Sequence, residues 1–118
     1  KQFGKPIMEH QMIQAMIADS QAETYAAECM IMDAARRRDA GEDVTLLASS
    51  TKLFATEACG RVADRAVQVF GGAGYVSDYG IERFYRDVRI FRLYEGTSQI
   101  QQIIIARELA RAAKKGTL

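Results

Sequence analysis

Residues 45–74, TLLASSTKLFATEACGRVADRAVQVFGGAG, carry the clearest structural pattern in the chain. Apolar side chains recur there every three or four residues, as they do on one face of an α-helix. They are Leu46, Leu47, Leu53, Phe54, Ala58, Val62, Ala66 and Val69. The spacing predicts a helix from about Asp43 or Thr45 to Phe70, which a cluster of glycines then stops.

The residues before this stretch follow the same period. Pro6 suits the first turn of a helix, where its missing N–H has no partner to lose. Asp39 and Gly41 then mark the end of the pattern. The sequence therefore predicts one long helix from Pro6 to about Asp39. Its apolar stripe is expected to lie in the core and comprises Met8, Met12, Ile13, Met16, Ile17, Tyr25, Cys29 and Met32.

Two shorter helices are predicted after the glycines. One covers Gly80 to about Phe91, and the other begins near Thr97, whose hydroxyl can cap the first free N–H groups. No alternating pattern of convincing length predicts a strand. The fold class is therefore all-α, an antiparallel up-and-down helical bundle, with residues 1–118 as a single domain.

Composition excludes several classes of function. The 118 residues carry a net charge of +1 and 26% charged residues, so neither nucleic acid nor a membrane surface is an expected partner. No apolar run is long enough for a membrane span, and the first residues contain no apolar signal core. Because Lys1 opens directly into a patterned segment, the chain is expected to be a piece of a longer protein.

The potential metal ligands are few. His10 is the single histidine, and no paired-cysteine motif is present, so no metal site is expected. Cys29 and Cys59 both lie in helical patterns and are predicted to be buried thiols in a reducing compartment. His10 itself is interpreted as a helix-surface or packing residue.

Two loops differ from ordinary turns between helices. Gly72-Ala73-Gly74 suggests a dinucleotide-binding motif, but such a motif follows a strand and opens a helix, whereas these glycines close one. The second loop, Tyr94 to Gln99, places Glu95 just before a helix N-terminus. Glu95 is interpreted either as a solvated acid near the helix dipole or as a desolvated general base, since burial beside an apolar ring raises the pKa of a carboxyl.

The stretch 68–107, QVFGGAGYVSDYGIERFYRDVRIFRLYEGTSQIQQIIIAR, resembles the C-terminal signature of acyl-CoA dehydrogenases. The opening, KQFGKPIMEHQ, is similar to another segment of that family. The resemblance implies the C-terminal helical domain of a larger flavoenzyme, without the first helix of that domain. An arginine that contacts flavin in the family would precede Lys1, so the isolated chain is expected to be inactive.

The resemblance also implies a reaction. The glutamate of Y-E-G-T, here Glu95, removes the α-proton of an acyl-CoA thioester, and a hydride leaves the β-carbon for FAD, which gives the trans-2-enoyl-CoA. The backbone N–H of Glu95 would bind the thioester oxygen. Tyr94, Glu95 and Gly96 are therefore the predicted substrate-binding residues, with Glu95 as the catalytic base.

The same resemblance assigns two groups of residues to FAD. Residues 68–72, with Phe3 and Gln11, match the segments that touch the adenosine end of a flavin held by a neighbouring subunit. Thr97 and Gln99 match residues near the phosphates of the chain's own flavin, where a helix N-terminus suits an anion. The full set is Phe3, Gln11, Gln68, Val69, Phe70, Gly71, Gly72, Thr97, Ser98 and Gln99.

The implied partners are an acyl-CoA, an electron-transferring flavoprotein and further copies of the chain in a tetramer. The location would be the cytoplasm of a bacterium or the mitochondrial matrix of a eukaryote. Two different interpretations stay open: an acyl-CoA oxidase-like enzyme of the same superfamily, and a non-catalytic helical interaction module.

Overall fold

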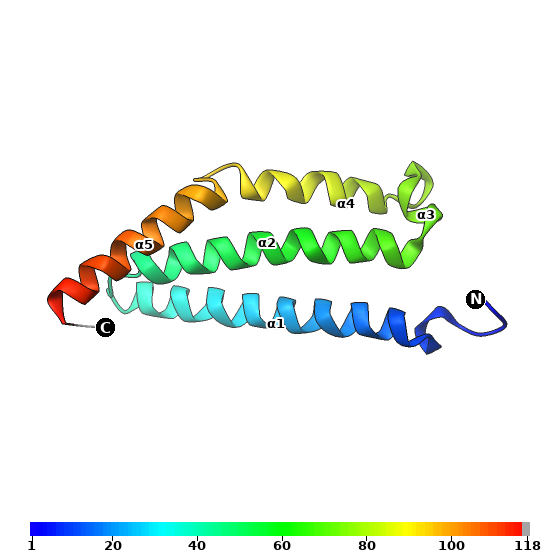
Figure 1. The fold of residues 1–118 in the computed structure, drawn as a ribbon, viewed down its shortest axis with the longest axis horizontal. Coiled ribbons are helices and arrows are strands. Elements are labelled where there is room, and N and C mark those ends of the chain that lie inside the picture. The colour runs from blue at the N-terminus through cyan, green and yellow to red at the C-terminus, as the bar shows by residue number, and fades with distance from the viewer. Residues whose placement is uncertain (117–118) are drawn as a thin grey trace.

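The computed structural model describes residues 1–116, and every regular element in this range is helical. The α-helices are α1 Gln11–Asp39, α2 Thr45–Phe70, α3 Gly72–Tyr75, α4 Ile81–Asp87 and α5 Ser98–Lys115, and the 3₁₀ turns are η1 Ile7–Glu9, η2 Ser77–Tyr79 and η3 Val88–Arg92. Helix α2 lies between α1 and α4 and runs antiparallel to both, while α5 returns obliquely past the first part of α2 (Figure 1). The predicted all-α antiparallel bundle is confirmed.

The first helix begins later than predicted. Pro6 precedes the short η1 turn, and His10 then adopts an extended backbone with φ −93° and ψ 125°. The Nε2 atom of His10 lies 3.2 Å from the carbonyl oxygen of Gln2, and its ring meets that of Phe3 edge-on at 6.0 Å. His10 therefore ties the N-terminal turn to α1 instead of continuing a helix, and it is a packing residue as interpreted.

The expectation that the Met stripe lies in the core is wrong for this chain. Met12 is 73% exposed and Tyr25 is 63% exposed. Cys29, predicted to be a buried thiol, is exposed as well, while Cys59 is half-buried and burial raises the pKa of its thiol. Apolar spacing identifies a helix face but not what covers it, and only α2 packs along α1 within residues 1–116.

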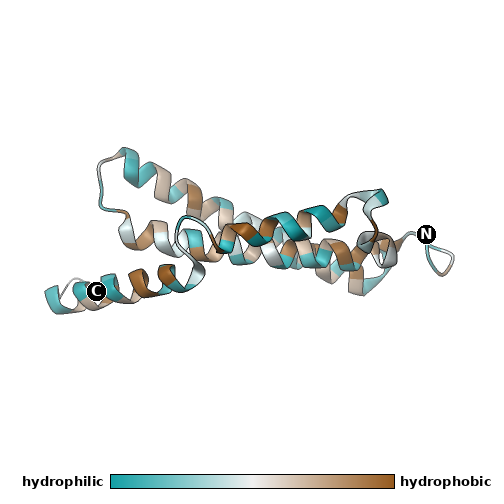
Figure 2. Cartoon of the chain, turned by 90° about the horizontal axis from the view of Figure 1, so that it is seen from above, coloured by the Kyte–Doolittle hydropathy of each residue, from teal (hydrophilic) through white to brown (hydrophobic). Residues whose placement is uncertain are grey.

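Apolar surface remains uncovered on α1 and α5 and at the end of α2. Figure 2 shows hydrophobic residues distributed along their whole length. Only Ala58 and Ala63 are buried apolar residues among residues 1–116, whereas Ile103 in the run Ile103–Ile105 is 62% exposed. Exposed apolar area of this extent is typical of a surface that other protein covers.

Glycines end α2 as predicted, but they also begin a turn that was not predicted. Gly71 has φ +60°, a left-handed conformation that favours glycine, and it stops the helix. The chain then forms α3, in which Gly74 is buried. A Cβ atom on Gly74 would lie 2.6 Å from the backbone oxygen of Val67, so no larger residue fits this close approach.

The other predicted boundaries lie close to the observed ones. Thr97 caps α5 because its hydroxyl accepts the N–H of Ile100 at 3.3 Å, which confirms the predicted cap. The third helix was predicted as one element to Phe91, but it tightens into the 3₁₀ turn η3 from Val88 onward. Such tightening is common where a helix ends.

Helices α1 and α2 are joined by one group of charges. The Glu23 carboxylate of α1 accepts from Arg61 Nε at 2.7 Å and from Arg65 Nη1 at 2.8 Å, both on α2. The hydrogen bond from Arg65, followed by that from Arg61, holds the pKa of Glu23 below its ordinary value. The buried residues of α2 are all small: Ser49, Thr51, Ala58 and Ala63.

Candidate active site

Residues 93–97 form a short connection between η3 and α5, and we call it the Glu95 arch. Glu95 has φ +53° and Gly96 has φ +88°, so two consecutive residues lie in the left-handed region. This conformation is uncommon for any residue other than glycine. The local backbone alone does not favour such a bend, and contacts from elsewhere in the fold hold it in place.

Two side chains bind the main chain of the arch from the inside. Lys52 Nζ of α2 donates to the carbonyl oxygen of Gly96 at 2.7 Å and to that of Phe91 at 2.8 Å. Gln101 of α5 is buried, and its Nε2 donates to the carbonyl oxygens of Glu95 at 3.3 Å and Gly96 at 3.4 Å. The arch is thereby fastened to both α2 and α5.

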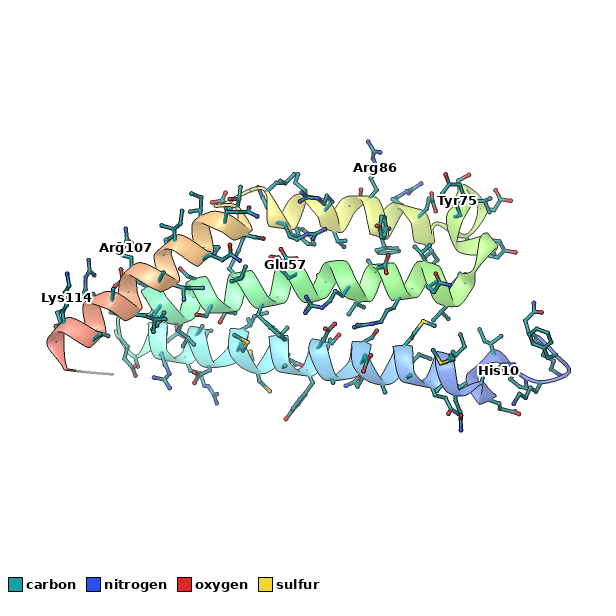
Figure 3. The ribbon with its side chains drawn as sticks, viewed as in Figure 1. His10, Glu57, Tyr75, Arg86, Arg107 and Lys114 are labelled. Carbon is teal, nitrogen blue, oxygen red and sulfur yellow. The ribbon has the colours of Figure 1, made fainter. Side chains whose placement is uncertain are left out.

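A second side chain of α2 secures the two ends of the arch. The Glu57 carboxylate accepts from Ser98 Oγ at 2.7 Å and from Arg92 Nη1 at 3.1 Å. Ser98 follows the arch directly and Arg92 precedes it. Figure 3 shows Glu57 on the side of α2 that faces this connection, while Arg86 and Arg107 point away from α2.

These contacts give Glu57 a pH-dependent role. The Ser98 hydroxyl, and after it the Arg92 guanidinium, lowers the pKa of Glu57 from its ordinary value of 4.5. A lowered carboxyl pKa stabilises the fold above pH 4.5, and that stabilisation is lost as the pH falls through the folded-state pKa.

We expect Glu57→Gln in the full-length protein to lower stability at pH 7 by about 1–2 kcal/mol, because it replaces a charge-assisted hydrogen bond by a neutral one. The difference in melting temperature between wild type and variant should shrink once the pH is below 4.5. Differential scanning fluorimetry from pH 7 to pH 3.5 measures it. Glu28→Gln, on the exposed face of α1, is the control. A difference that grows toward low pH would contradict the assignment.

The side chain of Glu95 is not desolvated by residues 1–116. It is exposed, and the neighbouring Tyr94 ring, itself half-exposed, stacks on Phe91 at 5.9 Å. Of the two interpretations of Glu95, the solvated acid describes its side chain within residues 1–116. The desolvated base stays a prediction for the full-length protein. Within the described residues neither the carboxylate nor the N–H of Glu95 has a hydrogen-bond partner. Both groups remain available for a ligand.

The predicted flavin-binding residues fall into two groups. Thr97, Ser98 and Gln99 lie at the N-terminus of α5, beside the Glu95 arch. Phe3, Gln11 and residues 68–72 lie at the other end of α2, where Lys1, Gln2 and Ile7 line a hollow of about 270 Å³ together with Val69 and Phe70. Lys52 is the residue of α2 that contacts the arch. Gln68 lies sixteen residues after Lys52, which is about 24 Å along the helix axis at 1.5 Å per residue. One chain thus presents the two groups to different regions of space.

Both groups have features that suit parts of FAD. Gly71 and Gly72 are exposed, and a Cβ atom on either would meet nothing within 4 Å, so a flat group can approach the backbone there. The N-terminus of α5 suits a phosphate because its first N–H groups have no helical acceptor. Ser98 can contribute only its backbone N–H, since its hydroxyl is buried and donates to Glu57.

Sequence reasoning missed Lys52, Glu57 and Gln101. Lys52 and Glu57 are charged residues inside the helix with the clearest apolar pattern, and that interruption is a detectable signal. It does not reveal which backbone atoms the side chains reach. Gln101 carries no local signal, because a glutamine in the first turns of a helix is ordinarily exposed.

Two classes of site have no support in residues 1–116. No cluster of three or more histidine, cysteine, aspartate or glutamate side chains in this range could hold a metal ion. None of the helices there combines the length and the apolarity that crossing a bilayer requires.

The chain has clear relatives. Residues 1–110 match the family described as acyl-CoA dehydrogenase, C-terminal domain. Cyclohexane-1-carbonyl-CoA dehydrogenase of Geobacter metallireducens is 48% identical over 113 residues, which are 96% of this chain and 30% of that protein. The caffeyl-CoA reductase–Etf complex subunit of Acetobacterium woodii is 44% identical over 94% of this chain and 29% of its own length.

Solved structures agree with the sequence relatives. The butyryl-CoA dehydrogenase of Megasphaera elsdenii superposes with a TM-score of 0.91 at 35% identity, over 93% of this chain and 29% of that one. The chain therefore spans about 30% of the length of the relatives that it matches. A family match over residues 1–110, together with the same fold at this level of identity, means that the chain belongs to the acyl-CoA dehydrogenase family and represents its C-terminal domain.

Proposed function

We propose that the full-length protein is an FAD-dependent acyl-CoA dehydrogenase that oxidises an acyl-CoA to the trans-2-enoyl-CoA, and that Glu95 is its general base. The observation that carries the proposal is the Glu95 arch. Its carbonyl groups are fastened inward by Lys52 and Gln101, while the carboxylate and the N–H of Glu95 have no partner within residues 1–116. A base for the α-proton and a hydrogen-bond donor for the thioester oxygen, both on one residue, are what an enolising thioester needs.

The chemistry assigns a separate role to each of these groups. The α-proton of a thioester is weakly acidic, so a positioned carboxylate must accept it while negative charge develops on the thioester oxygen. The Glu95 carboxylate accepts the proton, and the Glu95 N–H donates to that oxygen. FAD, when bound, supplies the acceptor for the hydride that leaves the β-carbon. Burial of Glu95, which residues 1–116 do not provide, would come from the remaining two-thirds of the full-length protein.

The reverse reaction is a second candidate. The Acetobacterium relative is named as a subunit of a reductase complex, so the family match does not fix the direction. By microscopic reversibility, a protonated Glu95 would then deliver the α-proton to an enoyl-CoA. An oxidase-like enzyme that uses molecular oxygen is a third candidate, and a non-catalytic helical module is a fourth.

The proposal extends to partners. The electron acceptor is an electron-transferring flavoprotein, and the exposed apolar faces of α1 and α5 are covered by other domains or by further subunits, in a tetramer. The two groups of flavin-binding residues, separated along α2, support an arrangement in which each flavin meets two chains. The location would be the bacterial cytoplasm or the mitochondrial matrix.

The decisive experiment uses the full-length protein loaded with FAD. Straight-chain, branched and cyclic acyl-CoAs are mixed with it anaerobically, and the absorbance of oxidised flavin is recorded in a stopped-flow instrument. We expect at least one acyl-CoA to bleach the flavin, with one enoyl-CoA formed per flavin. Reoxidation by electron-transferring flavoprotein but not by air identifies a dehydrogenase and excludes an oxidase. FAD-loaded protein that no acyl-CoA reduces would support the non-catalytic module, provided that, after reduction with dithionite, no enoyl-CoA reoxidises its flavin.

A further inference from the structure

We propose that Lys52 and Gln101 are positioning residues for Glu95, and that they act by holding the main chain of the arch in its left-handed conformation. The inference rests on the proposed function of Glu95 and extends it to two residues that do not contact the substrate. Lys52 comes from α2 and Gln101 from α5, so the position of the base depends on how these two helices are placed.

The hydrogen bonds of Lys52 are directed at the backbone alone. Its Nζ atom reaches the carbonyl oxygens of Phe91 and Gly96, on either side of Glu95, at 2.8 and 2.7 Å. No carboxylate pairs with this ammonium group among the described residues. A cation that neutralises no acid but spans both ends of an arch is suited to fixing its shape.

Gln101 adds hydrogen bonds to the same arch from a second helix, α5. It is only 7% exposed, and its amide donates to the carbonyl oxygens of Glu95 and Gly96. Gly96 has φ +88°, a conformation that favours glycine, and a Cβ atom there would lie 2.7 Å from Gln101 Nε2, so a larger residue would also displace the amide of Gln101. Gln101 and Gly96 are thus matched to each other.

Fixing a carbonyl also fixes the peptide plane to which it belongs. Gln101 holds the carbonyl oxygen of Glu95, and Lys52 and Gln101 hold that of Gly96, so the two peptide planes that follow the Cα atom of Glu95 cannot rotate freely. This restricts the backbone angles of Glu95 and therefore the placement of its side chain. A left-handed residue without these bonds relaxes toward ordinary backbone angles. Misplacement of a catalytic group by about 1 Å costs on the order of 10²-fold in rate.

The test compares Lys52→Met with wild type in the full-length, FAD-loaded protein. Methionine keeps an unbranched stem but has no donor. We expect the rate of reduction per bound flavin to fall about 10- to 100-fold, while FAD content stays near wild type. Amide hydrogen exchange over residues 93–98 should rise, a readout that does not depend on turnover. Lys114→Met, an exposed lysine of α5, is the matched control and should change neither quantity.

A double variant separates positioning from general stability. If Lys52 acts through Glu95, the effects of the two substitutions should not add. The double variant Lys52→Met/Glu95→Gln should then be reduced less than about threefold more slowly than Glu95→Gln alone. Independent effects that multiply would overturn the inference, and so would a wild-type rate per flavin in Lys52→Met. Where Lys52→Met does not accumulate as folded protein, Gln101→Met is judged by the same criteria.

The outcomes distinguish this inference from the proposed function. A wild-type rate in Glu95→Gln would show that Glu95 is not the base, and Lys52 and Gln101 would then have no base to position. A large loss in Glu95→Gln together with wild-type rates in Lys52→Met and Gln101→Met would keep the base and remove the positioning role.

Discussion

Replacing Glu95 by glutamine in the full-length protein is expected to lower the rate of flavin reduction by acyl-CoA about 10²- to 10⁴-fold, the range typical of losing a general base. Glutamine has the size and hydrogen-bonding shape of glutamate, so the arch should keep its bend and the N–H at this position should still bind the thioester oxygen. Only the capacity to take a proton is removed.

The loss should appear in one half of the catalytic cycle. Proton abstraction belongs to reduction of the flavin by substrate, so the rate of reoxidation by electron-transferring flavoprotein should stay within about twofold of wild type. FAD content and the dissociation constant for acyl-CoA should also be retained. Glu28→Gln serves as the control, because Glu28 is an exposed glutamate on α1 away from the arch. Near wild-type reduction in Glu95→Gln would place the base on another element of the protein.

The second large effect concerns the proposed flavin site that two chains share, to which one chain contributes residues 68–72 and its neighbour Glu95. Phe70→Asp in the full-length protein is expected to lower FAD affinity at least about tenfold, because an aromatic contact is replaced by a charge that the adenosine end of FAD cannot pair. Phe70 is 45% exposed, so aspartate can remain hydrated without unfolding α2. Fluorescence titration of the apoprotein with FAD measures the change.

Mixing the two variants tests whether one flavin meets two chains, at an FAD concentration that leaves Phe70→Asp alone largely without flavin. When Phe70→Asp and Glu95→Gln proteins are dissociated together and reassembled, about a quarter of the sites should combine an intact Glu95 with an intact Phe70 from its neighbour. Activity should recover to about that fraction of wild type. Recovery is not expected for the same proteins mixed without dissociation. A mixture that stays inactive after exchange, or an active FAD-loaded monomer in sedimentation, would contradict the shared site.

Local chemistry made most of the fold predictable. The end of α2 at Phe70 follows from the glycines, and the start of α5 follows from the Thr97 cap, since both depend on residues adjacent in sequence. The start of α1 was missed because His10 bonds to Gln2, and no helical pattern encodes that contact. The exposure of the Met stripe was missed for a different reason: periodicity marks a face without saying what covers it.

The candidate site was predictable only in part. The resemblance pointed to Glu95 and to the two flavin-binding segments, and these roles stay predictions. It did not indicate the left-handed backbone of Glu95, which no residue-type preference favours. Nor did it indicate Lys52, whose partners Phe91 and Gly96 lie far away in sequence. Contacts from a side chain to distant backbone atoms require the folded structure.

The double contact of Glu23 has a consequence for how the two longest helices can move. Ridges and grooves repeat along a helix, so a slide of one turn, about 5.4 Å, brings similar surfaces of α1 and α2 together again. Glu23 is held by Arg61 and Arg65 together, and such a slide would break both contacts. The ion pairs of Glu23 with Arg61 and Arg65 therefore fix the axial position of α1 relative to α2. They keep the N-terminal segment that precedes α1 beside the end of α2, where Gln2 and Ile7 line one hollow with Val69 and Phe70.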